Sequence, residues 1–147
     1  MNFAPHVTVA TVIERDEKYL LIKEESEGEL VFNQPAGHLE ADETLIEAAL
    51  RETYEETGWT VSIEGIVGIA LYRSPINGIT YHRNTFFASP VQHHPDQPLD
   101  EGIKAAVWMT YEEMLDNKQS MRSPLVIKAV AQYREGHRYP LEMIYSE

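Results

Sequence analysis

Apolar and polar positions along the chain fall into several strand-like runs and one long helical segment. Residues 6–14 and 18–23 are rich in Val, Ile, Leu and Tyr and flank a charged Arg-Asp-Glu turn, so they predict a β-hairpin. Residues 60–72 and 79–89 are β-branched and aromatic runs on either side of Ser-Pro-Ile-Asn-Gly, whose Asn-Gly pair is typical of a tight hairpin turn. A further strand is predicted over residues 103–109.

Residues 44–57 predict an amphipathic helix whose beginning and end are both marked. Thr44 and Glu47 are spaced as a capping box, in which each side chain accepts a hydrogen bond from the backbone N–H of the other residue. Gly58 supplies the residue type that most readily adopts the left-handed conformation where a helix ends.

Shorter elements and connections complete the predicted order. Thr110 begins a short helix, and Ser123 with the proline after it begins a longer helix that ends near Gly136. Short strand fragments are predicted near residues 30–32 and 38–39. Three segments are predicted as connections, namely 24–29, 33–37 and 90–102. Strands mixed with helices in this order predict the α/β (α+β) class, as a mixed sheet packed between helices in an α/β/α sandwich.

The composition describes one acidic domain spanning residues 1–147. The chain has 24 acidic and 12 basic residues, a net charge of −12, 43% hydrophobic residues and no cysteine, which excludes disulfides and thiolate zinc sites. No apolar run approaches the roughly 20 residues that span a bilayer. The N-terminus lacks the basic and apolar regions of a secretory signal, so we expect a cytoplasmic protein. The negative charge argues against nucleic-acid binding, and an anionic ligand would need a cation to mediate its contact.

One stripe of the predicted helix changes from apolar to acidic. Glu52, Glu55 and Glu56 lie at positions i, i+3 and i+4, so they share a face and repel one another. They also lie in the last turns, where the helix dipole is negative. Arg51 is expected to point to another face, so the three glutamates need a positive charge from elsewhere. Mg²⁺ could supply it, because this ion prefers oxygen ligands such as carboxylates. A solvated acidic face has the same spacing, and the pattern alone leaves both interpretations open.

The segment from Gly37 to Trp59 resembles the signature of the Nudix hydrolases. That signature is Gly, five residues, Glu, seven residues and then Arg-Glu-U-x-Glu-Glu-x-Gly-U, where U is a bulky aliphatic residue. The two U positions hold Thr53 and Trp59, a departure that affects helix packing more than chemistry. Every fixed position is matched, by Gly37, Glu43, Arg51, Glu52, Glu55, Glu56 and Gly58.

The resemblance implies roles for these residues. It implies the Nudix α/β/α sandwich and a Mg²⁺ site, in which bound metal activates a water; Mn²⁺ fits the same oxygen ligands. The implied metal ligands are Glu52, Glu55, Glu56 and the Gly37 carbonyl. The implied structural support comes from Glu43 and Arg51, which brace loop against helix, and from Gly58. Candidates for the general base are Glu52, Glu55 and a carboxylate from the loop before residues 103–109, for which we expect Glu101.

Segments 5–10, 33–40 and 122–144 resemble the bacterial NudJ-type phosphatases within that family. This resemblance implies hydrolysis of nucleoside tri- and diphosphates, and of the hydroxymethylpyrimidine pyrophosphate of thiamine synthesis, with release of orthophosphate. One alternative is a pyrophosphatase acting on ADP-ribose, dinucleotides or oxidised nucleotides, and a second is a non-catalytic nucleotide-binding module. The partner expected is a small nucleotide or diphosphate, with no nucleic acid and no membrane, in a monomer or homodimer.

Basic side chains on the predicted strands and before the last helix are candidates for substrate contacts. We expect these contacts from Lys23, Arg73, Arg83, Arg122 and Ser123. Aromatic residues of the middle hairpin, such as Tyr72 and Tyr81, either stack on a base or pack in the core, and the sequence leaves that choice open.

Overall fold

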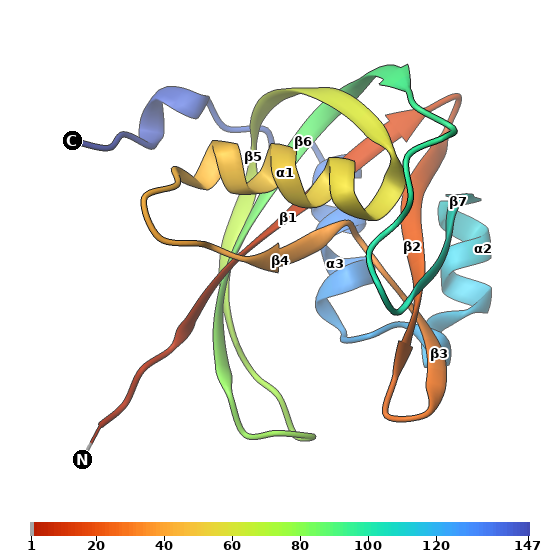
Figure 1. Cartoon of the computed structure of the whole chain (residues 1–147), viewed down its shortest axis with the longest axis horizontal. Coiled ribbons are helices and arrows are strands. Elements are labelled where there is room, and N and C mark those ends of the chain that lie inside the picture. The colour runs from red at the N-terminus through yellow and green to blue at the C-terminus, as the bar shows by residue number, and fades with distance from the viewer. Residues whose placement is uncertain (1) are drawn as a thin grey trace.

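A mixed seven-stranded sheet forms the centre of the molecule. The computed structural model describes residues 2–147, and the strand order is β3-β2-β1-β6-β5, with β4 paired to β1 and β7 paired to β2 (Figure 1). β1 and β6 run parallel, and the other pairs are antiparallel. The strands are β1 (His6–Arg15), β2 (Lys18–Ser26), β3 (Glu29–Asn33), β4 (Ala36–His38), β5 (Trp59–Arg73), β6 (Thr80–His93) and β7 (Ile103–Thr110).

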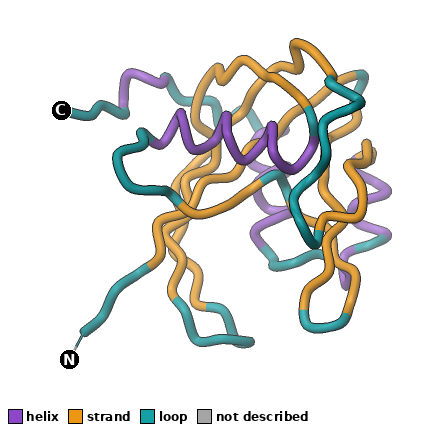
Figure 2. Tube along the Cα trace, in the orientation of Figure 1, coloured by secondary structure: helices purple, strands orange, loops and turns teal. Residues whose placement is uncertain are grey.

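Helices cover both faces of the sheet, which confirms the predicted α/β/α sandwich (Figure 2). Helix α1 (Leu45–Thr57) packs over one apolar cluster that includes Val9 and Phe86. Helix α3 (Leu125–Arg134) packs over another cluster, which includes Val12 and Val67, on the opposite face. Helix α2 (Tyr111–Asp116) follows β7. Within the described residues, no helix has both the length and the apolar character that a membrane crossing requires.

Local signals set the bounds of α1 as predicted. Thr44 and Glu47 form both hydrogen bonds of the capping box. At the other end Gly58 has φ 75° and its N–H donates to the Tyr54 carbonyl. Residues other than glycine rarely adopt this backbone conformation, so the helix ends where the chain can turn toward β5.

Strand β1 changes its neighbour along one edge, and this change creates space beside the sheet. β6 pairs with β1 over His6–Ile13, whereas the other edge of β1 pairs with β4 at residues 8–10 and with β2 only at residues 14–15. Between these two neighbours the Thr11 N–H donates to the Pro35 carbonyl at 3.1 Å. The chain between β3 and β4 therefore enters the gap where β2 and β4 separate.

Some predicted bounds are wrong because strand pairing extends beyond the apolar runs. β6 continues to His93, which pairs with Trp59, so the predicted loop 90–102 is shorter than expected. The predicted connection 24–29 is part of a hairpin, in which Ser26 pairs with Glu29. Polar residues continue both strands because backbone hydrogen bonds maintain the pairing there, and Glu25, Gln92 and His93 are exposed.

Substitution of Gly58 tests how α1 ends. A Cβ at Gly58 would lie 3.0 Å from the His94 carbonyl oxygen, in addition to the strain of its positive φ. Gly28 has a similar φ of 79° with no atom within 4 Å of an added Cβ, so Gly28→Ala measures the strain alone. We expect Gly28→Ala to cost about 1 kcal/mol of unfolding free energy and Gly58→Ala about 1 kcal/mol more, in urea denaturation. Equal losses would contradict the contact with His94.

Candidate active site

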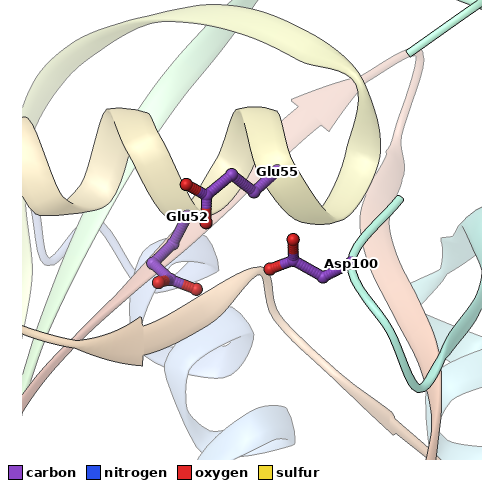
Figure 3. A group of neighbouring side chains, drawn as sticks. All are labelled: Glu52, Glu55 and Asp100. Atoms are coloured by element: carbon purple, nitrogen blue, oxygen red, sulfur yellow. The ribbon is translucent and has the colours of Figure 1, made fainter. Parts of the chain in front are cut away.

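Three carboxylates from two parts of the chain meet near the C-terminal end of α1. Glu52 and Glu55 lie on neighbouring turns of the helix, and Asp100 comes from the loop between β6 and β7 (Figure 3). One carboxylate oxygen of each residue lies within 4.8 Å of the other two. Oxygens that share one Mg²⁺ at about 2.1 Å lie at most about 4.2 Å apart. The oxygens of this group are therefore close to the spacing that such a cation requires.

Backbone hydrogen bonds hold the loop of Asp100 against the end of α1. The Asp100 N–H donates to the Glu55 carbonyl at 3.0 Å, and the His94 N–H donates to the Gly58 carbonyl at 2.8 Å. Carbonyls at a helix C-terminus lack partners within the helix and need donors from outside it. The loop supplies such donors, and in doing so it places the Asp100 carboxylate beside those of the helix.

Arg51 is the cation that links these carboxylates to the loop before α1. Its Nε and Nη2 donate to the two oxygens of Glu43 at 2.7 and 2.9 Å, and Nη2 also donates to the His38 carbonyl at 3.0 Å. Its Nη1 donates to Glu52 and lies 3.4 Å from Glu55. The expectation that Arg51 points away from the acidic stripe is therefore wrong, because its long side chain turns back across the helix surface.

The hydrogen bonds between Glu43 and Arg51 shift the pKa values of both side chains. The bonds from Arg51 hold the pKa of Glu43 below its ordinary value of 4.5. Hydrogen bonding to Glu43 in turn raises the pKa of Arg51. Both shifts favour the charged forms, so the two residues brace the loop against α1.

Burial disfavours the charged forms of two carboxylates of α1, Glu52 and Glu56. Burial raises the pKa of Glu56 to about 9, although its Oε1 accepts the Ala36 N–H at 2.8 Å. Burial also raises the pKa of Glu52. Glu56 lies outside the group formed with Asp100 among the described residues. A cation bound nearby favours the charged form of both groups.

Gly37 on β4 lets the Glu52 side chain lie against the backbone. A Cβ added at Gly37 would overlap the Glu52 carboxylate carbon and both of its oxygens. Only glycine leaves this space, so its residue type is required by the position of Glu52.

A cavity of about 260 Å³ begins at Gly37 and extends between two hairpins. The β2–β3 hairpin contributes Glu24 and Ser26 to its wall. The β5–β6 hairpin contributes Tyr72 and Tyr81, which are cross-strand partners. Both tyrosines therefore belong to the cavity wall rather than to an apolar core.

Three of the residues predicted to contact the substrate line this cavity. They are Arg83, Arg122 and Ser123. Burial lowers the pKa of Arg83 to about 10, so its side chain stays charged at neutral pH. Arg122 Nη1 donates to Glu24 Oε1 at 2.5 Å at the mouth of the cavity. The cavity wall thus combines two arginines with aromatic surface, and it also includes Glu24 and Glu27.

Other predicted contacts lie elsewhere. The Lys23 ammonium lies 5.9 Å from the centre of the Phe32 ring, and neither Lys23 nor the exposed Arg73 lines the cavity. Glu101 is exposed and does not belong to the carboxylate group, in which Asp100 takes the expected place. The one-residue difference arises because the Asp100 N–H, and not that of Glu101, bonds the end of α1.

Sequence reasoning missed Asn33 and Gln34, whose side-chain oxygens accept hydrogen bonds from Arg83. Their polarity beside a predicted sharp loop was the available signal. Polar residues in a loop are usually solvated, however, and only the fold reveals that Gln34 is completely buried.

Comparison with known proteins decides the family. A profile of the NUDIX domain matches residues 4–129. The chain is 43% identical over 142 residues to Phosphatase NudJ of Escherichia coli K12, covering 97% of this chain and 92% of that protein. The chain belongs to the Nudix hydrolase family. The same identity and coverage hold for Phosphatase NudJ of Shigella flexneri. As a Nudix hydrolase, the protein acts on pyrophosphate bonds.

Solved Nudix structures agree with this fold. A Nudix hydrolase from Nitrosomonas europaea superposes with a TM-score of 0.96 at 43% identity, covering 98% of each chain. A UDP-X diphosphatase superposes with a TM-score of 0.75 at 20% identity, covering 95% of this chain and 68% of that one. The second likeness supports the Nudix fold alone.

Substitution of Gly37 tests whether Glu52 needs the space on β4. We expect Gly37→Ala to displace the Glu52 carboxylate and to lower turnover at least about 100-fold, since catalytic groups tolerate little misplacement. In the control Gly68→Ala the nearest atom to the new Cβ is Gln132 Oε1 at 3.5 Å, so turnover should be unchanged. Steady-state kinetics with circular dichroism of both variants make the measurement, and normal turnover of Gly37→Ala would contradict the requirement.

The ion pair of Glu43 and Arg51 should make a pH-dependent contribution to the free energy of unfolding. Because the folded pKa of Glu43 lies below 4.5, its contribution is complete above that pH and is lost as the pH falls through the folded pKa. We expect Glu43→Gln to be less stable than the parent protein at pH 7, with a difference that shrinks below about pH 4.5. Urea denaturation between pH 7 and pH 3.5 measures both curves. A difference that stays constant to pH 3.5 would contradict the pairing.

Proposed function

We propose that the protein is a Mg²⁺-dependent hydrolase of nucleoside tri- and diphosphates that releases orthophosphate. The pyrimidine pyrophosphate named above belongs to the same substrate class. One observation carries this proposal. The carboxylate group of Glu52, Glu55 and Asp100 lies beside a cavity that contains two arginines, and Gly37 lies between that group and the cavity. The phosphatase relatives support the same chemistry.

The donor set fits a hard divalent cation. Three carboxylate oxygens converge, and Arg51 is the cation hydrogen-bonded to this group within residues 2–147. Glu52, Glu55 and Asp100 would hold Mg²⁺, with Glu56 and the Gly37 carbonyl as the further ligands that the signature implies. Mn²⁺ prefers the same oxygens. A bound ion of this kind lowers the pKa of coordinated water and neutralises phosphate oxygens.

The chain's own residues supply orientation and proton transfer. Arg83 and Arg122 would bind phosphate oxygens in the cavity, where charge-assisted hydrogen bonds are strong. Tyr72 and Tyr81 would contact the organic part of the substrate. One carboxylate of the group would accept the proton from the attacking water, and Asp100 replaces Glu101 as the candidate from outside the helix.

The size of the cavity favours simple nucleotides over dinucleotides. Its volume of about 260 Å³ is below the range of about 300–1,000 Å³ typical of drug-sized ligands. A dinucleotide carries two nucleosides and would leave one of them outside. A non-catalytic module is disfavoured because mutually repelling carboxylates give such a module no physical benefit.

Product analysis tests the proposed reaction. The protein is incubated with Mg²⁺ and a panel of nucleoside di- and triphosphates, ADP-ribose and diadenosine polyphosphates, and orthophosphate is assayed with and without inorganic pyrophosphatase. We expect direct orthophosphate from the simple nucleotides, unchanged by pyrophosphatase. A signal that requires pyrophosphatase, or cleavage of ADP-ribose alone, would contradict the proposal in favour of another Nudix activity.

Two matched variants test the role of the carboxylate group in this assay. We expect Glu55→Gln to lower turnover at least about 100-fold, because it removes a charged oxygen from the group. Glu112→Gln makes the same change at an exposed position of α2 and should keep the parent rate. Equal rates for the two variants would exclude Glu55 from the site.

A further inference from the structure

Arg83 carries a buried positive charge that no carboxylate pairs with in the described chain. Its side chain is on β6, the residue is only 9% exposed, and its Nε has no hydrogen-bond partner among residues 2–147. Its recorded hydrogen bonds come from Nη2 alone. An arginine has five N–H donors, so most of the guanidinium is left for another partner. Because a buried charge is costly unless paired, this arrangement needs an explanation beyond packing.

Two neutral amides hold the guanidinium in place. Nη2 donates to Gln34 Oε1 at 2.8 Å and to Asn33 Oδ1 at 3.2 Å. The Gln34 side chain is fixed in turn, because its Nε2 donates to the Val126 carbonyl at 2.7 Å. That bond places the amide oxygen, and not the amide nitrogen, toward Arg83. The amides therefore orient Arg83 without cancelling its charge.

The charged groups near Arg83 are already engaged with other partners. Glu24 accepts the ion pair from Arg122, and Glu56 accepts the Ala36 N–H. Arg122 adds positive charge in the same region and so disfavours the charged form of Arg83. Arg83 also forms part of the cavity wall. Glu24 and Glu56 favour the charge of Arg83 from a distance, but within residues 2–147 no carboxylate forms an ion pair with it, so the cavity contains a fixed cation without a direct counter-ion.

We propose that Asn33 and Gln34 are positioning residues that hold Arg83 as a receptor for an oxyanion in the cavity. Resting on the proposed function, this anion is the phosphate on the leaving-group side of the scissile bond. The carboxylate group does not line the cavity, which meets it only near Gly37. A substrate whose reacting phosphate lies at the carboxylates therefore extends its next phosphate toward Arg83. Compounds without that second phosphate lose this contact.

The variant Asn33→Asp tests the proposal with almost no change of shape. The new carboxylate would accept the same hydrogen bond from Arg83 and neutralise it, so an oxyanion would no longer be needed. The protein is titrated without metal, in EDTA, with inorganic phosphate and with a nucleoside monophosphate. The signal is the ¹⁵N-edited resonance of the Arg83 Nε–H, identified by its loss in Arg83→Lys.

We expect phosphate and the nucleoside monophosphate to shift this resonance in the parent protein. In Asn33→Asp we expect both dissociation constants to rise at least about tenfold, as is typical for a lost charge-assisted contact. The unfolding free energy should stay the same or increase, because a buried cation gains a counter-charge. The control Gln92→Glu adds the same charge at an exposed position of β6 and should bind like the parent protein.

Two results would overturn the proposal. One is unchanged phosphate affinity in Asn33→Asp, which would make Arg83 a structural residue. The other is acetate binding as tightly as phosphate, which would make the anion a carboxylate. Should Asn33→Asp fail to fold, isothermal titration calorimetry of phosphate with the parent protein and with Arg83→Lys applies the same test, because lysine retains the charge without the fixed guanidinium and the heat of binding does not depend on the Arg83 resonance. Since these titrations need neither metal nor turnover, they can succeed even where the proposed hydrolysis fails.

Discussion

Repulsion among carboxylates is the constraint on which the rest of the site depends. Glu52 and Glu55 share one face of α1, and Asp100 is brought beside them by a loop. Each would be more stable apart, because like charges repel one another at these distances. Arg51 offsets part of the repulsion from within the protein, and it also reaches Glu43 in the preceding loop. The residual negative charge is the feature that favours a divalent cation.

The sheet provides the second half of the site by separating its strands. Along one edge β1 pairs first with β4 and then with β2, which leaves a gap between these two neighbours. The segment of Asn33 and Gln34 enters this gap and contacts Arg83 on β6. Gly37, a few residues later, allows Glu52 to approach the backbone. One short segment between two strands therefore contacts both the carboxylates of the site and the cavity that contains Arg83. This proximity gives an anionic substrate complementary partners on either side of the segment.

Local signals in the sequence were sufficient for the helix and for the strand order along the chain. The capping box of Thr44 and the glycine at position 58 act within one turn, so the bounds of α1 could be predicted. The Nudix signature extended this to the family, which the comparisons confirm. Long-range contacts were beyond such signals. Asp100 rather than Glu101 faces the helix because of one backbone hydrogen bond across 45 positions of sequence, to Glu55.

Side chains whose roles depend on tertiary packing were predicted least well. Lys23 and Arg73 have the same charge as Arg83, but of the three only Arg83 lines the cavity. Gln34 resembles an ordinary loop residue until the segment is placed between β1 and α3. The kind of charge at the site could be predicted from composition and motif. The direction in which each side chain points could not, because it is fixed by strand register and burial.

The most direct test of the account is Mn²⁺ binding to the parent protein, Asp100→Asn and Glu101→Gln, measured by electron paramagnetic resonance of the free ion. We expect Asp100→Asn to bind Mn²⁺ at least about tenfold more weakly, since it removes a ligand charge, and Glu101→Gln to bind like the parent protein. Weaker binding in Glu101→Gln with normal binding in Asp100→Asn would contradict the arrangement of carboxylates described here.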